Sequence, residues 1–228
     1  MFLTESRRFK SSTAAWLARQ RGDHFLRARA EANYRSRSAF KLLQINKQHK
    51  LFPPLSSSQK PSREKRPFTV VDLGCSPGGW TQVSLELLGF SMNAHVEERE
   101  DEDESVEIPA VVGVDLLQTE PLLGARFLQG NFLDQRVQAD LRNLIRGVTH
   151  PEMDDSGVAD LIVSDMAPNL SGNRISDIEA SLALCRSVLA FAQMNLRPAD
   201  EKGKGKSYRG SLVFVSFHPP NDSWSRVY

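Results

Sequence analysis

A parallel α/β fold is what the pattern of this 228-residue chain indicates. Five short runs rich in β-branched residues recur along it, and stretches with helical periodicity separate them. The composition, 40% hydrophobic and 25% charged, is apolar enough to fill a core. Strands that alternate with helices in this way specify a doubly wound, mostly parallel sheet. No apolar run reaches the roughly 18 residues that a membrane-spanning helix needs, so no membrane span is expected.

The expected elements follow one another along the chain. A helix over residues 38–51 ends at Pro53 and Pro54, and a polar linker over 56–67 precedes the first strand. Strands are expected at 68–73, 110–115, 125–128, 159–165 and 210–215, and helices at 80–88, 135–146 and 177–196. In the last helix, the expected core residues are Leu182, Leu184, Cys185, Val188, Leu189, Phe191 and Met194.

The formal net charge of +1 conceals two segments of opposite sign. The first 50 residues hold twelve Lys and Arg against three acids, whereas residues 97–107 hold eight acids and one Arg. The basic arm is typical of a phosphate-binding surface with salt-dependent attraction to RNA, and a solvated helix face or an import signal is the alternative. The acidic run is expected to be a disordered surface loop.

The extreme N-terminus resembles a short targeting segment. Residues 1–15 are rich in Arg, Ser and Thr, and Glu5 is their only acid. Such a composition is typical of a mitochondrial presequence, and a plain basic tail is the alternative. We therefore expect residues 1–33 to be an extension ahead of the fold, and we expect a mitochondrial location.

Acidic residues lie at the carboxyl ends of three of the expected strands, one at the penultimate position and two at the last. Asp72, Asp115 and Asp165 occupy these positions, and the first strand leads into a glycine-rich turn at 74–79. Because ligands of parallel sheets lie at the carboxyl ends of the strands, these carboxylates are expected at one ligand-binding edge. Asp115 suits both hydroxyls of a ribose. The glycine spacing fits neither a dinucleotide fingerprint nor a P-loop, which favours an adenosyl ligand without phosphates over a dehydrogenase cofactor.

Cysteine and histidine give no sign of a metal site. The two cysteines cannot form a disulfide framework or a four-ligand zinc site, and the five histidines have no ligand spacing. No metal is therefore expected. Cys75 is expected to pack as a small apolar residue.

Five motifs together resemble a known family. They are residues 35–42 (RSRSAFKL), 72–80 (DLGCSPGGW), 113–117 (GVDLL), 127–132 (FLQGNF) and 164–169 (SDMAPN). In this order they resemble the FtsJ/RrmJ family of S-adenosylmethionine-dependent ribosomal RNA 2'-O-methyltransferases, with a Rossmann-like sheet. The likeness runs from about Trp16 to Val215. Residues 16–20 (WLARQ) and the basic N-terminus are most similar to the mitochondrial branch, which modifies a uridine of large-subunit rRNA.

The resemblance implies a role for each site residue. The cofactor would be S-adenosylmethionine, bound by Pro77, Gly78, Gly79, Trp80, Asp115, Asn131, Phe132 and Asp165. Asn131 stands where family members often carry Asp beside the adenine. Lys41 and Asp165 would be catalytic, and Arg35, Arg37 and Lys41 would bind RNA. The implied partner is ribosomal RNA or the large ribosomal subunit, and a monomer is expected.

The likeness stops at the fifth strand. The family is thought to use a Lys-Asp-Lys-Glu tetrad, and Val215 takes the place of its second lysine, or Ser216 if the alignment shifts by one. The last hairpin and its glutamate are missing, so the domain spans 34–217 and residues 218–228 form a tail outside the family pattern. Two interpretations stay open. We favour a truncated or mis-spliced methyltransferase with impaired turnover over a non-catalytic rRNA-binding ribosome-assembly factor with a vestigial cofactor pocket.

Overall fold

The computed structural model describes residues 33–54, 67–90, 111–148, 159–169, 171–198 and 210–215. In this part of the chain, five strands form one sheet in the order β3-β2-β1-β4-β5. Each neighbouring pair is parallel. The strands are β1 (Val70–Leu73), β2 (Val111–Asp115), β3 (Ala125–Gln129), β4 (Leu161–Ser164) and β5 (Ser211–Phe214). The predicted doubly wound sheet is confirmed, and its described strands are all parallel.

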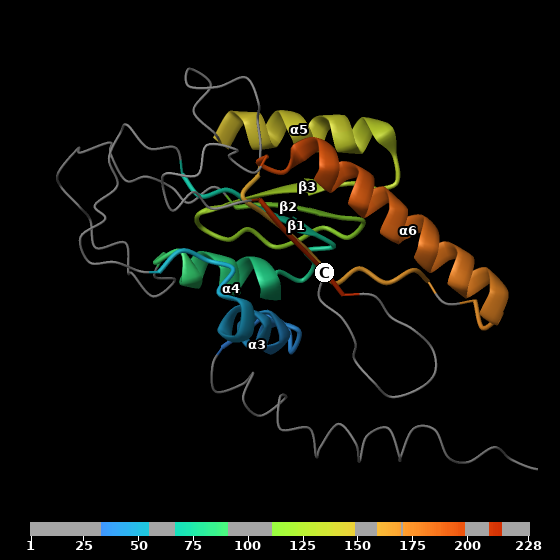
Figure 1. Ribbon diagram of the computed structural model, residues 1–228, viewed down its shortest axis with the longest axis horizontal. Helices are drawn as coiled ribbons and strands as arrows, with labels where there is room; N and C mark the ends of the chain where they lie inside the picture. Colours follow the sequence, from blue (N-terminus) through green and yellow to red (C-terminus); the bar gives the residue numbers. More distant parts are fainter. Residues whose placement is uncertain are drawn as a thin grey trace, which may run out of the picture.

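Helices cover both faces of the sheet (Figure 1). On one face lie α3 (Ala39–His49) and α4 (Gly79–Leu87), and on the other α5 (Gln135–Val148) and α6 (Arg174–Asn195). Each face has its own apolar cluster, because successive strand residues point to opposite sides. Val70 packs with the residues of α3 and α4, whereas Val71 packs with those of α5 and α6.

Helix α6 differs most from the sequence expectation. It begins at Arg174, earlier than predicted, because the Asn173 side chain accepts hydrogen bonds from the backbone N–H groups of Ile175 and Ser176. Its buried apolar residues include Leu184, Val188 and Phe191, so these predictions are confirmed. Leu182, Leu189 and Met194 are exposed, and Cys185 is only half-buried. The prediction was wrong for these residues because α6 carries apolar side chains on several sides and the sheet covers one.

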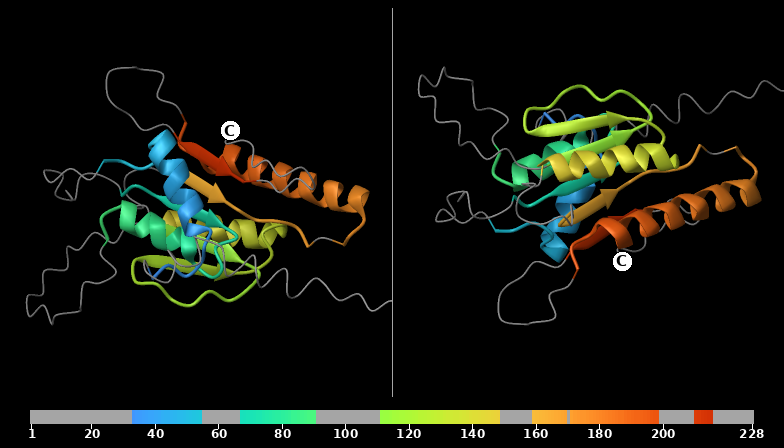
Figure 2. Two further views of the ribbon diagram at one scale, coloured as in Figure 1. Left: turned by 90° about the horizontal axis from the view of Figure 1, so that it is seen from below. Right: turned by 90° about the horizontal axis from the view of Figure 1, so that it is seen from above.

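The strand order changes direction beside β1, and this places the site. The chain runs outward through β2 and β3, then returns to put β4 on the other side of β1 (Figure 2). The carboxyl ends of β1, β2 and β4 therefore meet at one edge of the sheet. In open parallel sheets the crevice at such a reversal binds the ligand.

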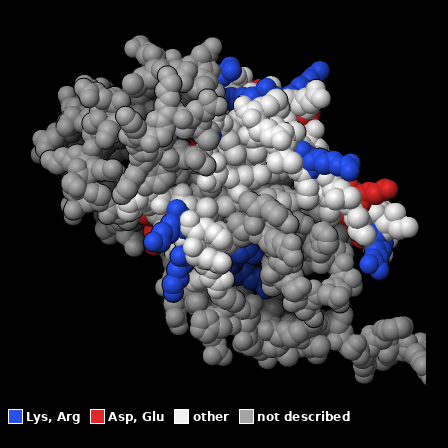
Figure 3. Space-filling view, viewed as in Figure 1, with Lys and Arg blue, Asp and Glu red and all other residues white. Residues whose placement is uncertain are grey.

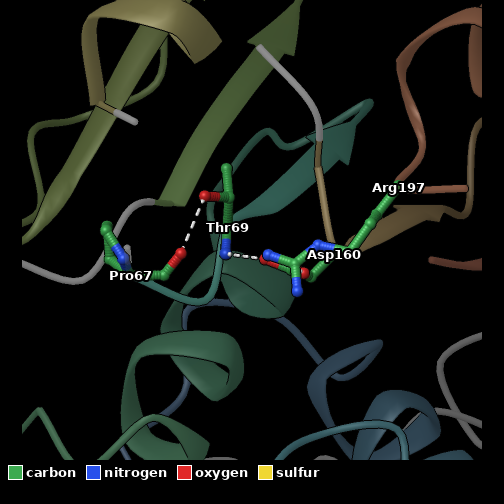
Figure 4. Close-up of polar contacts among 4 residues, drawn as sticks. All are labelled: Pro67, Thr69, Asp160 and Arg197. Atoms are coloured by element: carbon green, nitrogen blue, oxygen red, sulfur yellow. Dashed lines mark hydrogen bonds and ion pairs between the residues drawn. The ribbon is translucent and has the colours of Figure 1, made fainter. Parts of the chain in front are cut away.

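The opposite edge of the sheet is closed by a buried carboxylate (Figure 4). Asp160 precedes β4 and accepts a hydrogen bond from the backbone N–H of Thr69 at 2.8 Å. The Arg197 guanidinium pairs with the same carboxylate at 3.0 Å. The backbone carbonyl of Asp160 accepts from Ser211 at the start of β5. These bonds join the amino ends of β1, β4 and β5, at the edge of the sheet opposite the ligand edge.

Several sequence predictions lie outside the described residues. These are the extension up to residue 32, most of the linker at 56–67, the acidic loop at 97–107 and the tail at 218–228. In the part of the chain that the structure describes, no helix is both long and apolar enough to cross a lipid bilayer.

Candidate active site

A basic segment leads into the site. Residues 33–50 contain five Lys and Arg and no acid. In Figure 3, some Lys and Arg side chains lie near the place where Figure 1 shows α3, and others lie along the upper and right margins of this face. Arg37 is exposed, whereas Arg35 and Lys41 are half-buried. This surface suits a polyanion, and its three predicted RNA-binding residues differ in how far they reach solvent.

Lys41 and Asp165 form an interacting pair across the sheet edge. Lys41 lies in α3, and Asp165 directly follows β4. Burial lowers the pKa of the Lys41 ammonium, Asp165 opposes that effect, and Arg37 adds to it. Burial raises the pKa of Asp165, while Lys41 and a hydrogen bond from Ser38 oppose that rise. The structure thus brings the two predicted catalytic residues together and makes the neutral amine of Lys41 easier to form.

Ser38 is a site residue that sequence reasoning missed. It was predicted only as the first residue of a helix over 38–51, and its side chain caps no backbone group of α3. Its hydroxyl instead hydrogen-bonds to Asp165 and shares a 2.7 Å hydrogen bond with the Ser36 hydroxyl. Its carbonyl accepts from the Trp80 indole N–H at 2.8 Å. The RSRS pattern at 35–38 was a signal, but nothing in it indicated a contact with Asp165.

The glycines of the predicted cofactor turn make room for protein neighbours. A Cβ on Gly74 would overlap the Met166 side chain, and one on Gly79 would overlap the Ser36 hydroxyl. Gly78 has φ +110°, and a Cβ there would press on Arg35. The turn is therefore shaped by packing against the segments that carry Lys41 and Asp165. The predicted cofactor contacts of Pro77, Gly78, Gly79 and Trp80 stay predictions, and the Trp80 ring itself is buried.

Asp115 joins the two loops at the ends of β1 and β2. One carboxylate oxygen accepts from the backbone N–H of Ser76 at 2.9 Å, and the other accepts from that of Leu117 at 2.8 Å. A carboxylate offers about four acceptor positions, so both oxygens retain capacity for ribose hydroxyls. Asp115 is half-buried, which is compatible with contact to a ligand.

Asn131 and Phe132 follow β3 and differ in orientation. Asn131 is exposed, and its side-chain oxygen accepts from the Leu133 N–H at 3.0 Å, which leaves its amide N–H groups as the donors a ligand would meet. The Phe132 ring is buried edge-on against Phe191, with centroids 5.4 Å apart. Any contact of Phe132 with an adenine would therefore use its backbone, and its cofactor role stays a prediction.

Asp72 provides a test of whether a cationic cofactor fits. Its carboxylate is fully buried, and one oxygen accepts from the Thr81 hydroxyl at 2.6 Å. The other oxygen has no hydrogen-bond partner among the described residues. Burial raises the pKa of Asp72 to about 7, and the charges of Asp165 and Asp115 add to the rise. A positively charged group bound at this edge would offset the repulsion among Asp72, Asp115 and Asp165 without touching Asp72, whose carboxylate does not reach the surface.

We expect Asp72→Asn to change how stability depends on pH. The pKa of Asp72 is about 7 in the folded protein and 3.8 in the unfolded one. Its contribution to the free energy of unfolding is therefore fully present below pH 3.8 and is lost as the pH rises through 7. The free energy of unfolding of the variant minus that of the unchanged protein should therefore rise by up to about 4 kcal/mol between about pH 4 and pH 8. Urea unfolding across that range measures this, and parallel curves for the two proteins would contradict it.

The end of β5 brings Val215 to the same edge. Its backbone N–H donates to the carbonyl of Ser164 at 2.9 Å, directly beside Asp165. Its side chain packs with the cluster that contains Ala39 and Leu42 of α3. An apolar side chain thus occupies the position where the resemblance implies a second lysine.

Cys75 packs inside the site as predicted. Its thiol is buried and lies 3.5 Å from the Thr119 hydroxyl. Burial raises the pKa of this thiol to about 12, so it is neutral near pH 7. Among the described residues, no group of three or more His, Cys, Asp and Glu side chains could hold a metal ion.

The chain is similar to known methyltransferases in sequence. Residues 34–219 match the family described as FtsJ-like methyltransferase. The "Ribosomal RNA large subunit methyltransferase E" of Neisseria meningitidis serogroup C is 33% identical over 186 residues, which cover 82% of this chain and 72% of the relative. The protein of the same name from Acinetobacter baylyi is 32% identical over 206 residues, which cover 90% of this chain and 77% of the relative.

A solved structure supports the fold. The crystal structure of a protein from Plasmodium falciparum, described as a ribosomal RNA methyltransferase, superposes with a TM-score of 0.52. The match covers 82% of this chain and 80% of that one at 22% identity. At this identity the likeness concerns the arrangement of the sheet and helices.

Proposed function

Because the chain belongs to the FtsJ-like methyltransferase family, we propose that its site binds S-adenosylmethionine and serves methylation of a ribose 2'-hydroxyl in large-subunit ribosomal RNA. The finer assignment, a uridine of mitochondrial rRNA, rests on the likeness of residues 16–20 and of the basic N-terminus to that branch. The names of the bacterial relatives support large-subunit rRNA as the substrate.

One observation carries the choice of cofactor: three carboxylates share the ligand edge. Asp115 and Asp165 both raise the pKa of Asp72, and Asp115 raises that of Asp165, so the groups repel one another. A ligand with positive sulfonium and ammonium groups relieves that repulsion, whereas the pyrophosphate of a dinucleotide would add to it. The glycine spacing, which lacks a phosphate-binding pattern, supports the same choice.

The residues around Asp165 would help to remove the proton of the target hydroxyl. When bound, S-adenosylmethionine supplies a methyl group on a positively charged sulfur. A ribose hydroxyl attacks well only if its proton leaves during the transfer, and the neutral Nζ of Lys41 can accept that proton. Asp165 orients the Lys41 amine, and Ser38 holds Asp165. Arg37 lowers the pKa of Lys41 and would also contact the RNA backbone.

We also propose a mitochondrial location and a monomeric state. The composition of residues 1–15 supports the location. A fluorescent reporter that carries residues 1–33 tests it: import into mitochondria supports the location, and a diffuse signal contradicts it. Sedimentation of the purified chain reads its oligomeric state.

A binding protein without turnover is the second candidate, favoured by Val215 at the place of the second lysine. Calorimetry with S-adenosylmethionine and with NAD, followed by RNA binding with and without cofactor, separates the two. A methyltransferase should bind S-adenosylmethionine and not NAD, and should lose transfer in Lys41→Ala. An assembly factor should bind rRNA equally with and without cofactor, and Lys41→Ala should weaken that binding. Arg146→Ala, an exposed change in α5 outside the basic segment, is the control.

A further inference from the structure

We propose that Arg35 is a positioning residue, which locks the cofactor turn to the loop after β2, and is not a phosphate contact. The inference rests on the proposed function, because it takes these two loops to hold S-adenosylmethionine. It changes the role that the motif at 35–42 implies for Arg35, and it leaves Arg37 and Lys41 as the RNA-binding residues of that motif.

The hydrogen bonds of Arg35 carry the proposal. One terminal nitrogen of its guanidinium, Nη1, donates to the carbonyl of Glu120 at 2.7 Å and, at 3.4 Å, to that of Pro77. The other, Nη2, donates to the carbonyl of Pro121 at 2.9 Å. Pro77 belongs to the turn after β1, whereas Glu120 and Pro121 belong to the loop after β2. A single side chain therefore bridges the two loops.

The turn is built around this side chain. Gly78 has φ +110°, and a Cβ on it would lie 3.1 Å from Cδ and Nη1 of Arg35 and 3.4 Å from Leu122. The turn thus lies directly against both Arg35 and the loop after β2. Asp115 joins the same two loops from the other end through Ser76 and Leu117. Asp115, which would hold the ribose, and Arg35 therefore connect the same two loops at different points.

The backbone of Arg35 is fixed as well. Its N–H donates to the Gln82 side-chain oxygen at 2.8 Å, and the Gln82 amide donates to the carbonyl of Asn33 at 3.0 Å. From Arg35 the chain passes Ser36, which lies against Gly79, and Ser38, which contacts Trp80 and Asp165. The position of the cofactor loops is thereby linked to that of α3 and Lys41.

An RNA phosphate would have to compete with these carbonyl contacts. These bonds lie at exposed positions, where each contributes only modestly to stability, and a phosphate contact would have to replace them together. Arginine suits this role because its planar fork directs separate N–H groups to separate acceptors, whereas a lysine presents a single point charge. Arg37, two residues later, is exposed and offers a natural comparison.

The test compares Arg35→Lys and Arg35→Gln with Arg37→Lys and Arg37→Gln in the full chain. Arg35→Lys keeps the charge and loses the fork, so S-adenosylmethionine should bind at least about tenfold more weakly by calorimetry. In the transfer reaction the KM for the methyl donor should rise while kcat at saturating donor changes less than about threefold. Both Arg37 variants should bind the methyl donor within about twofold of the unchanged chain.

RNA binding gives the opposite ranking. The slope of log affinity for transcribed large-subunit rRNA against log salt should fall by about 0.7 to 0.9 in Arg37→Gln and stay unchanged in Arg35→Gln. A reduced slope in Arg35→Gln with unchanged binding of the methyl donor would overturn the proposal and return Arg35 to phosphate contact.

Hydrogen exchange without any ligand keeps the two proposals separable. In Arg35→Lys, peptides over 74–80 and 115–124 should exchange at least about tenfold faster, while those in α5 and α6 keep their rates and show that the fold is intact. Unchanged exchange in both loops would overturn the positioning role. If the unchanged chain binds no S-adenosylmethionine but Arg35→Lys still loosens the loops, the cofactor assignment fails and the loop lock stands.

Discussion

Asp115→Ala is expected to weaken binding of S-adenosylmethionine by about 100-fold or more. The change removes the acceptors for the Ser76 and Leu117 N–H groups and the acceptor proposed for the ribose. Each hydrogen bond to a charged group contributes roughly 1.5–3 kcal/mol, and the two loops also lose their common anchor. Isothermal calorimetry at constant salt measures the effect.

Two further variants make the Asp115 result specific. Asp115→Asn keeps one acceptor oxygen and should bind with intermediate affinity. Asp140→Ala, an exposed change on α5 away from the ligand edge, should bind like the unchanged chain. Circular dichroism melting shows whether each variant is folded. A folded Asp115→Ala protein with unchanged affinity would contradict the assignment of the ribose site.

Val215→Lys is expected to raise the rate of methyl transfer by about 100-fold or more. The backbone of Val215 bonds to Ser164, beside Asp165, and its side chain packs on the face that carries α3. A lysine there would bring a second ammonium near Lys41, and like charges lower each other's pKa. A lower pKa leaves more of the Lys41 amine neutral and able to accept the proton, and general-base catalysis contributes roughly 10²–10⁴-fold in all, which bounds the expected gain.

Single-turnover transfer to rRNA measures the Val215 effect. Val215→Met is the matched control, because it adds length without charge. Ser216→Lys tests the alternative alignment by one residue. Transfer by Val215→Lys that is no faster than by Val215→Met would show that this position does not supply the second lysine.

The sequence predicted the fold well because the signals were local. The short β-branched runs and the helical stretches between them indicated the doubly wound sheet, and the strand ends at Asp115 and Asp165 indicated its ligand edge. Helix α6 was predicted less well, since its apolar residues lie on several sides. Periodicity could not tell that the sheet covers Leu184 and Val188 but not Leu182 and Leu189.

The sequence predicted which residues belong to the site better than it predicted their contacts. The structure brings Lys41 and Asp165 together, as the motifs implied. The partners of Arg35, Ser38 and Asp72 depend on segments more than 40 residues away or on the depth of burial, which no local pattern encodes. Gly78 and Gly79 were predicted to bind the cofactor, which stays a prediction. In the structure, the missing Cβ atoms of Gly74, Gly78 and Gly79 leave room for Met166, Arg35 and Ser36, a packing role that the sequence did not indicate.

We propose that residues at the carboxyl ends of β1, β2 and β4 serve the methylation of an RNA ribose. Transfer of tritium from the methyl group of S-adenosylmethionine to large-subunit rRNA, followed by digestion to nucleosides, tests it most directly. We expect label in a 2'-O-methyluridine, formed slowly by this chain, faster by Val215→Lys and not by Lys41→Met. Label on a base, or no label from either this chain or Val215→Lys, would contradict it.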